Sequence, residues 1–265
     1  MIILIILPTT MLSSSSGDAV VVVMIVGLFA GLFTVAEYAS ESPSLIEFRD
    51  APPYNRVRFI AIFCSVYLLS LLFQGNPGNS MLVDVLGELA MRIGYSVDFP
   101  YSPVRLMLVM MPDDTPPATL DALRTAAGLC YFVSLLSLAV FVSMLRSRLW
   151  PRRTQTFNFW VNLPTFDPTV GGDVVDRLNR DSAVNLILGF LLPFMIPAIL
   201  KLTAMFIGTF KFEDPQTLIW MVVIWAFLPS SLLMRGIALS RVAGLIHVQR
   251  KKAYAAAAAE GMLPV

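Results

Sequence analysis

The sequence predicts an all-α protein that crosses a membrane about five times, and two observations support this fold class. First, 57% of the 265 residues are hydrophobic and only 14% are charged, whereas a soluble domain carries about 25% charged residues. Second, the apolar residues gather in five runs that approach the ~20 residues needed to cross ~30 Å of hydrocarbon. We therefore expect one integral membrane domain over residues 1–265.

The five expected spans contain mainly aliphatic and aromatic residues, and their short connections are polar or rich in proline. We place them at residues 19–36, 57–73, 126–145, 183–210 and 218–234. The residues before the first span include a short apolar run that ends near Pro8, and we expect that run to lie at the membrane surface. An amphipathic continuation of the fifth span beyond Arg235 is also expected.

Basic residues near the span ends predict the orientation, because loops on the cytoplasmic side carry an excess of Lys and Arg. Such residues follow the third and fifth spans: Arg146, Arg148, Arg152, Arg153, Arg235, Arg241, Arg250, Lys251 and Lys252. We therefore expect a multi-pass protein of a bacterial inner membrane. Its N-terminus would lie outside and its C-terminus in the cytoplasm. The outer segment is then 74–125, the inner segment 146–182 and the cytoplasmic tail 235–265.

The outer segment is predicted to contain an amphipathic helix starting near Met81. Asp84, Glu88 and Arg92 recur every four residues, which aligns them in one charged stripe opposite apolar residues. We expect this helix to lie on the membrane surface or against a partner.

Composition argues against several classes of function. A net charge of +1 lacks the basic surface that nucleic acids require. The single histidine, His247, excludes a bis-histidine haem site within the chain, and Cys64 and Cys130 form no CxxC pair. No GxSxG, P-loop or HExxH motif occurs. We expect no cofactor, no metal site and no catalytic residues.

Five residues inside the expected spans have both a functional and a structural interpretation. Lys201 is an intramembrane charge, which is often functional, although a lysine near the interface can extend its amine to it. Pro193 and Pro197 kink the fourth span, and the kink could form a gate or merely a curve. Gly27 and Gly31 form a GxxxG pattern that predicts close helix packing, within the chain or with a partner.

The connection between the first two spans carries more polar residues than orientation requires. Arginines alone would define its side of the membrane, yet the loop also contains acidic, amide and tyrosine side chains. We take this segment as the expected element for docking a partner, through Glu47, Arg49, Asp50, Tyr54 and Asn55.

The segment after the fifth span is basic, and a cytoplasmic basic helix can bind anionic lipid headgroups. The candidate residues are Arg235, Arg241, Lys251 and Lys252. The alternative interpretation is that these charges only define orientation, and the two are compatible.

Three hypotheses of function follow. The first is a non-catalytic accessory, assembly or scaffold subunit of a larger membrane complex, of the kind that respiratory and photosynthetic assemblies contain. Its partners would be the lipid bilayer and other integral membrane proteins. The second is a small transporter or channel that uses Lys201 and the kinked fourth span, with a homo-oligomer supplying the internal repeat that the chain lacks. The third is an interfacial enzyme acting on a lipid or quinone.

Overall fold

The computed structural model describes residues 1–12, 17–74, 81–147, 150, 157–167, 169, 171–207 and 214–259. Within these ranges the regular structure is α-helical and no strand occurs. Among the described residues, five helices are long and apolar enough to cross a membrane: α2 (Gly17–Ala39), α3 (Pro52–Leu72), α6 (Pro117–Arg146), α8 (Val174–Ile207) and α9 (Pro215–Ala259). The predicted fold class and number of spans are therefore confirmed.

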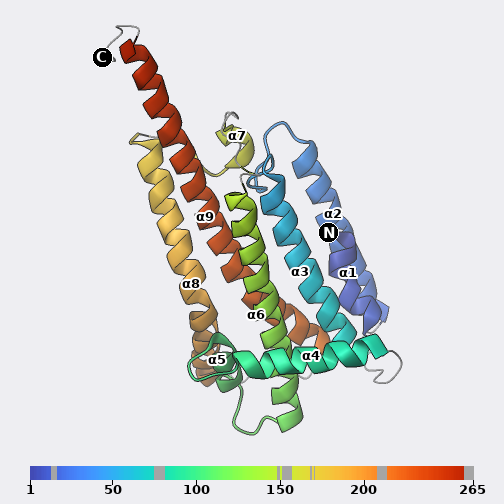
Figure 1. Cartoon of the computed structure of the whole chain (residues 1–265). Coiled ribbons are helices and arrows are strands. Elements are labelled where there is room, and N and C mark those ends of the chain that lie inside the picture. The colour runs from blue at the N-terminus through green and yellow to red at the C-terminus, as the bar shows by residue number, and fades with distance from the viewer. Residues whose placement is uncertain are drawn as a thin grey trace.

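The long helices run side by side, with α8 and α9 on one side of the bundle and α2 at the opposite edge (Figure 1). Two of them begin earlier than the sequence suggested. The helix α6 begins at Pro117 rather than near residue 126, and α8 begins at Val174 rather than near residue 183. The helix α9 runs to Ala259 without a break at residue 234, so the expected continuation beyond Arg235 is part of one long helix.

Short helices mark the two ends of the bundle (Figure 1). The helix α4 (Met81–Val97) lies across one end, beside α5 (Pro103–Val109), and we call this the α4 end. The helix α7 (Phe159–Asn162) lies at the opposite end, from which the last turns of α9 project, and we call this the α7 end. The crosswise α4 is the amphipathic helix predicted from its charged stripe, and Glu88 and Arg92 form an ion pair on it.

The N-terminal helix α1 (Ile2–Met11) differs from the expectation of a surface segment, because it packs lengthwise on α2. Gly31 faces the side chain of Ile2, and Gly27 faces that of Ile6, so the two helices run antiparallel. A Cβ built on Gly31 would lie 2.5 Å from Cγ1 of Ile2. The predicted close packing at the GxxxG pattern is thus found within the chain, and its neighbour is α1.

Two other helix crossings bring backbones into direct contact. A Cβ on Gly128 of α6 would lie 2.4 Å from Cα of Gly94 in α4, so these two helices meet backbone to backbone. Between α8 and α9, a Cβ on Gly236 would lie 2.9 Å from the carbonyl oxygen of Ser182. The hydroxyl of Ser182 donates to the carbonyl of Gly236 at 2.7 Å. Small residues permit such approaches in membrane helices.

In the part of the chain that the structure describes, the buried side chains form two clusters, one toward each end of the bundle. The cluster toward the α4 end includes Leu69, Met107, Leu123, Ile219 and Trp225. The cluster toward the α7 end includes Phe48, Tyr54, Phe141, Leu178 and Met234. The second cluster contains residues from the connection between α2 and α3, so that loop is part of the core.

Candidate functional site

The loop between α2 and α3 begins around a buried carboxylate. Glu37, in the last turns of α2, is 5% exposed. Its carboxylate accepts hydrogen bonds from the backbone amides of Ser44, Leu45 and Ile46 at 3.0, 2.9 and 3.1 Å. A carboxylate that receives several amide donors is held as an anion in one position. Glu37 therefore sets the path of the chain as it leaves the helix.

The middle of this loop turns inward through Phe48. Phe48 has a positive φ of 52° and is fully buried, which indicates that tertiary packing imposes its strained backbone. Its ring packs against Tyr54, with centroids 4.6 Å apart, and against Trp150 at 5.7 Å. Its amide donates to the carbonyl of Asn162 in α7 at 2.7 Å. The loop is thereby anchored to α7.

Glu47 connects the same loop to the last long helix. Its carboxylate forms a two-point contact with the guanidinium of Arg235 in α9, with N–O distances of 2.6 and 2.8 Å. The hydroxyl of Thr165 donates to the same carboxylate at 3.3 Å. Both side chains of the ion pair are mostly buried, so this contact is shielded from solvent and stronger than an exposed pair.

The proposed docking residues are largely occupied by contacts inside the chain. Besides Glu47, Arg49 donates to the carbonyl of Ser40, and the amide of Asn55 donates to the carbonyl of Phe48 at 3.1 Å. Tyr54 is 1% exposed. Only the side chain of Asp50 lies on the surface, while its backbone amide donates to Asn162. Partner binding by this segment stays a prediction, and the geometry assigns four of its five side chains to the fold.

Arg58 adds a second cation to the α7 end. Its guanidinium lies over the rings of Tyr54 and Phe227, at 4.8 and 5.8 Å from their centroids. Its Nε is buried and has no hydrogen-bond partner among the described residues. Stacking on aromatic faces stabilises a partly desolvated guanidinium. The contact joins α3 to α9 next to the Glu47–Arg235 pair.

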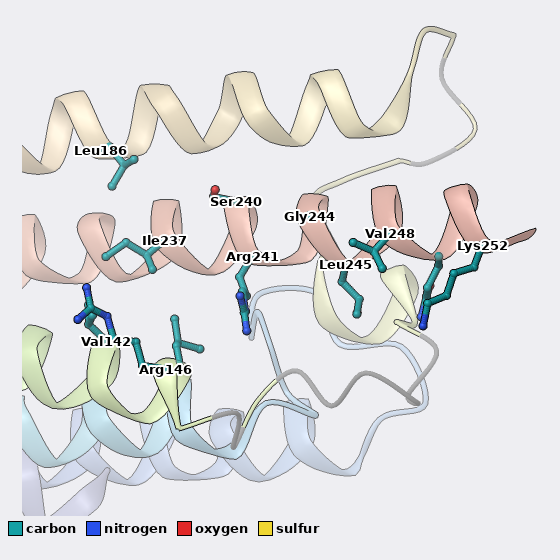
Figure 2. Close-up of a pocket in the computed structure, with 12 residues that line it drawn as sticks. Val142, Arg146, Leu186, Ile237, Ser240, Arg241, Gly244, Leu245, Val248 and Lys252 are labelled. Atoms are coloured by element: carbon teal, nitrogen blue, oxygen red, sulfur yellow. The ribbon is translucent and has the colours of Figure 1, made fainter. Parts of the chain in front are cut away.

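A cleft lies between α6, α8 and α9 toward the α7 end and has a volume of about 950 Å³ (Figure 2). Its wall is mainly aliphatic, and its polar residues come from α6 and α9. The lining residues are Val142, Leu145, Arg146, Leu186, Ile237, Ser240, Arg241, Gly244, Leu245, Val248, Gln249 and Lys252. In Figure 2, Arg241, Leu245 and Lys252 extend from the same side of α9.

The basic residues of α9 fall into two groups. Arg235 is paired with Glu47, and Arg250 contacts Asp173 at 2.7 Å. Arg241 and Lys252, which line the cleft, are exposed and form no ion pair within the described ranges. Arg146, at the end of α6, is in the same situation. Of the four predicted headgroup residues, Arg235 is therefore paired with Glu47. Arg241 and Lys252 line the cleft, whereas Lys251 lies outside it.

The part of α8 that contains Pro193 and Pro197 is joined to α9 by a hydrogen bond. Because Pro197 has no N–H, the carbonyl of Pro193 lacks its usual donor four residues later in the helix. The indole Nε1 of Trp225 in α9 donates to this carbonyl at 3.1 Å, in a buried position. The proline pair thus exposes a carbonyl that a neighbouring helix binds, which favours the structural interpretation of the kink over a gate.

Lys201 also makes a contact between elements. Its Nζ donates to the carbonyl of Val109 at the end of α5, at 2.8 Å. The last carbonyls of a helix have no partner within it and attract cations. Lys201 therefore connects α8 to α5 at the α4 end of the bundle.

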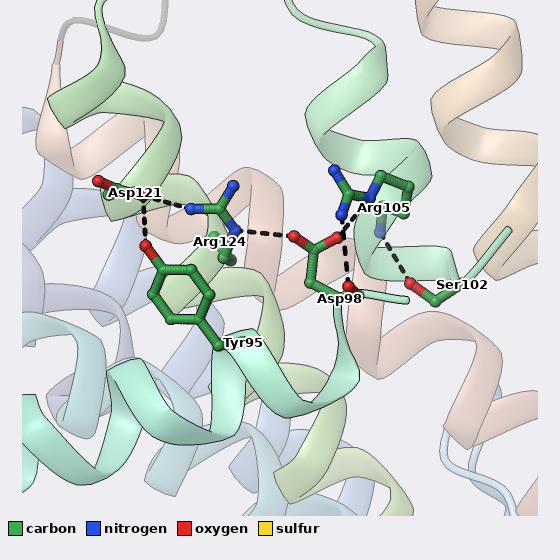
Figure 3. A network of polar contacts seen from close by, with 6 residues as sticks. All are labelled: Tyr95, Asp98, Ser102, Arg105, Asp121 and Arg124. Atoms are coloured by element: carbon green, nitrogen blue, oxygen red, sulfur yellow. Dashed lines mark hydrogen bonds and ion pairs between the residues drawn. The ribbon is translucent and has the colours of Figure 1, made fainter. Parts of the chain in front are cut away.

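A further polar network, which the sequence analysis did not single out, lies at the α4 end (Figure 3). Asp98 is buried between Arg105 and Arg124, with Nε of each 2.8 Å from one carboxylate oxygen. The contact with Arg124 is a hydrogen bond. Oδ1 forms the ion pair with Arg105 and has no hydrogen-bond partner among the described residues. The sequence did contain a signal for this network. Arg105 and Arg124 lie in a segment expected to be outside, where arginines are uncommon, and this could have indicated that they have acidic partners.

The same network extends to the surface through Tyr95. The guanidinium of Arg124 lies 4.6 Å from the centre of the Tyr95 ring and pairs with Asp121. The hydroxyl of Tyr95 donates to Asp121 at 3.0 Å. Together these contacts fix the end of α4 to the start of α6.

Within the described ranges, no group of three or more His, Cys, Asp or Glu side chains has a geometry that could hold a metal ion. Comparisons with protein-family models, curated proteins and solved structures find no match to this chain.

Proposed function

We propose that the chain is a non-catalytic integral membrane protein that serves as an accessory, assembly or scaffold subunit of a larger membrane complex. The observation that supports this proposal is the use of its charged side chains in contacts within the fold. Glu47 pairs with Arg235, Asp98 lies between two arginines, and Lys201 binds a helix-end carbonyl. Each contact joins two elements of the fold, so these charges have a structural task.

This use of charge favours a scaffold over a transporter. A transport path requires polar groups that can exchange a protein partner for the transported substrate. Lys201 and the proline pair motivated the transporter hypothesis, and both are engaged in contacts between helices. A lipid- or quinone-handling enzyme would draw on the polar loop, where Glu47 and Asn55 hold the loop in place.

The proposed partners are lipids and other integral membrane proteins, with the N-terminus outside and the C-terminus in the cytoplasm of a bacterial inner membrane. The helix α2 supports a membrane partner, because α1 covers one side of it and most of its apolar side chains are exposed. Phe29, Leu32 and Phe33 are among these exposed residues. Such a face fits lipid or an apolar helix of another subunit.

Co-purification tests the proposal directly. The chain, tagged at its native level of expression, is extracted with a mild detergent and separated by size, and membranes that carry the tag alone serve as the control. We expect elution well above the 29.2 kDa monomer in its micelle, together with at least one stoichiometric membrane protein. A clean monomer without such a protein would refute the proposal.

Flux measurements distinguish the transporter alternative. The wild type and Lys201→Met are reconstituted into vesicles, and the leak of ions and small solutes is compared with that of empty vesicles. We expect no flux above empty vesicles from either protein, and a lower thermal stability for Lys201→Met because the Val109 carbonyl loses its donor. Flux in the wild type that disappears in a folded Lys201→Met would favour the transporter.

A further inference from the structure

The cleft between α6, α8 and α9 has the two chemical parts of a phospholipid site, an apolar wall and a basic edge. Leu186 and Ile237 belong to the wall, whereas Arg146, Arg241 and Lys252 provide the cationic groups. We propose that this cleft binds an anionic phospholipid of the surrounding bilayer. The proposal is independent of the accessory function, since a transporter or an enzyme could carry the same lipid site.

The order of residues along the cleft matches the order of groups in a lipid. The apolar stretch of α6 ends at Arg146, which marks the depth where this helix leaves the hydrocarbon. On α9, Ile237 comes first, Arg241 follows one turn later, and Lys252 lies about 16 Å further along the axis. Acyl chains would contact Leu186 and Ile237, and the phosphate would lie between Arg146 and Arg241.

Charge determines the sign of the headgroup. Other arginines of α9 have acidic partners, Glu47 for Arg235 and Asp173 for Arg250, whereas the basic residues of the cleft have none in the described part of the chain. Guanidinium groups bind phosphate through two parallel N–H donors. An anionic headgroup therefore supplies the counter-charge that the fold itself does not provide.

The apolar wall determines the source of the phosphate. A free phosphate would use only the basic edge and would leave the apolar wall formed by Leu145, Leu186 and Ile237 uncovered. A phospholipid covers both parts, and a cleft of about 950 Å³ is large enough for a headgroup with the first part of its chains.

Gly244 offers a way to fill the cleft without disturbing the fold. A Cβ built on it meets no atom within 4 Å, although the residue lines the cleft. Gly244→Phe should therefore occupy the space without displacing a neighbouring helix. It should not weaken α9 either, because every residue except proline is a better helix former than glycine. Gly244→Ala is the matched control for the change in helix propensity.

The test measures lipid binding to the purified full-length chain in detergent. Phosphatidylglycerol, phosphatidylcholine and inorganic phosphate are titrated separately, and bound lipid is counted by native mass spectrometry while the thermal unfolding midpoint is recorded. We expect retention and stabilisation with phosphatidylglycerol only. Each basic residue near an anionic lipid contributes about fivefold, so the double variant Arg146→Gln with Arg241→Gln should bind about 25-fold more weakly. Lys251→Gln, which removes a charge from the same helix outside the cleft, should bind like the wild type.

Gly244→Phe should lose the lipid while its unfolding midpoint without lipid stays at or above that of the wild type. Unchanged binding in the double arginine variant or in a folded Gly244→Phe would overturn the proposal. If inorganic phosphate stabilised the protein as much as phosphatidylglycerol does, the basic edge would bind a free anion. If Lys251→Gln lost as much lipid binding as the double arginine variant, the effect would come from overall charge. Either result would also overturn the proposal. If a co-purifying protein protects Arg241 from modification where lipid does not, the cleft is a protein interface and the lipid proposal fails.

Discussion

The hydrogen bond from Trp225 to Pro193 gives a test of why α8 contains two prolines. Trp225→Phe removes the indole N–H and leaves the carbonyl of Pro193 buried without a donor, because Pro197 cannot supply one. An unsatisfied buried acceptor costs about 1–3 kcal/mol, and comparable bonds in membrane proteins lie toward the lower part of that range. The smaller ring also loses packing, including part of its stacking on Tyr131.

A double-mutant cycle with Pro197→Ala separates the two effects. Alanine restores the N–H that can bond to the carbonyl of Pro193 within the helix, so that carbonyl no longer depends on Trp225. The packing loss of Trp225→Phe is present in both backgrounds and cancels. We expect Trp225→Phe to cost about 1 kcal/mol less in the Pro197→Ala background than in the wild type.

The measurement is reversible unfolding by sodium dodecyl sulfate in dodecyl maltoside micelles, followed by the fluorescence of the remaining tryptophans. All four proteins of the cycle are compared under identical lipid and detergent conditions. If Trp225→Phe costs the same free energy in both backgrounds, the indole does not compensate for the missing amide, and our explanation of the proline pair is refuted.

The remaining predictions concern three other contacts. Glu47→Gln should lower the free energy of unfolding by about 2 kcal/mol, and less in an Arg235→Gln background; equal costs in the same unfolding assay would show that the pair is uncoupled. Gly128→Ala should lower the free energy of unfolding by about 1–3 kcal/mol through overpacking, whereas Gly244→Ala should be neutral or stabilising, so equal effects would contradict the backbone contact with α4. The pKa of Asp173 is lowered by the amide of Val175 and then by Arg250, so its stabilising contribution is present above about pH 4 and is lost as the pH falls through the lowered pKa. Between pH 6 and pH 3, the thermal unfolding midpoint should therefore fall more steeply for the wild type than for Asp173→Asn. Parallel curves of midpoint against pH would contradict this assignment.

Parts of the site could be anticipated from local patterns. The GxxxG pattern at Gly27 and Gly31 predicted a close helix contact, because spacing by four places both glycines on one face, and both glycines face side chains of α1. The basic residues after the spans indicated where positive charge would gather. No local pattern indicated that α1 would be the neighbour of the glycines, since α1 is too short to be identified as a spanning element.

Other parts depend on residues that are far apart in the chain. Glu47 and Arg235 are separated by 188 positions, so the sequence analysis assigned one to protein docking and the other to lipid headgroups. In the fold they neutralise each other. Asp98 likewise acquires its role only because α5 and the start of α6 bring Arg105 and Arg124 to it.

The sequence by itself determined the class of structure, its five spans and the distribution of basic residues along them. The physical reason is that hydrocarbon offers the backbone no hydrogen-bond partners, so each long apolar run must satisfy its own amides and carbonyls as a helix. Tertiary structure alone decided which charges are paired and which remain available in the cleft of α6, α8 and α9. Pairing depends on which helices become neighbours, and neighbours are selected by packing between distant residues such as Gly128 with Gly94 and Gly236 with Ser182.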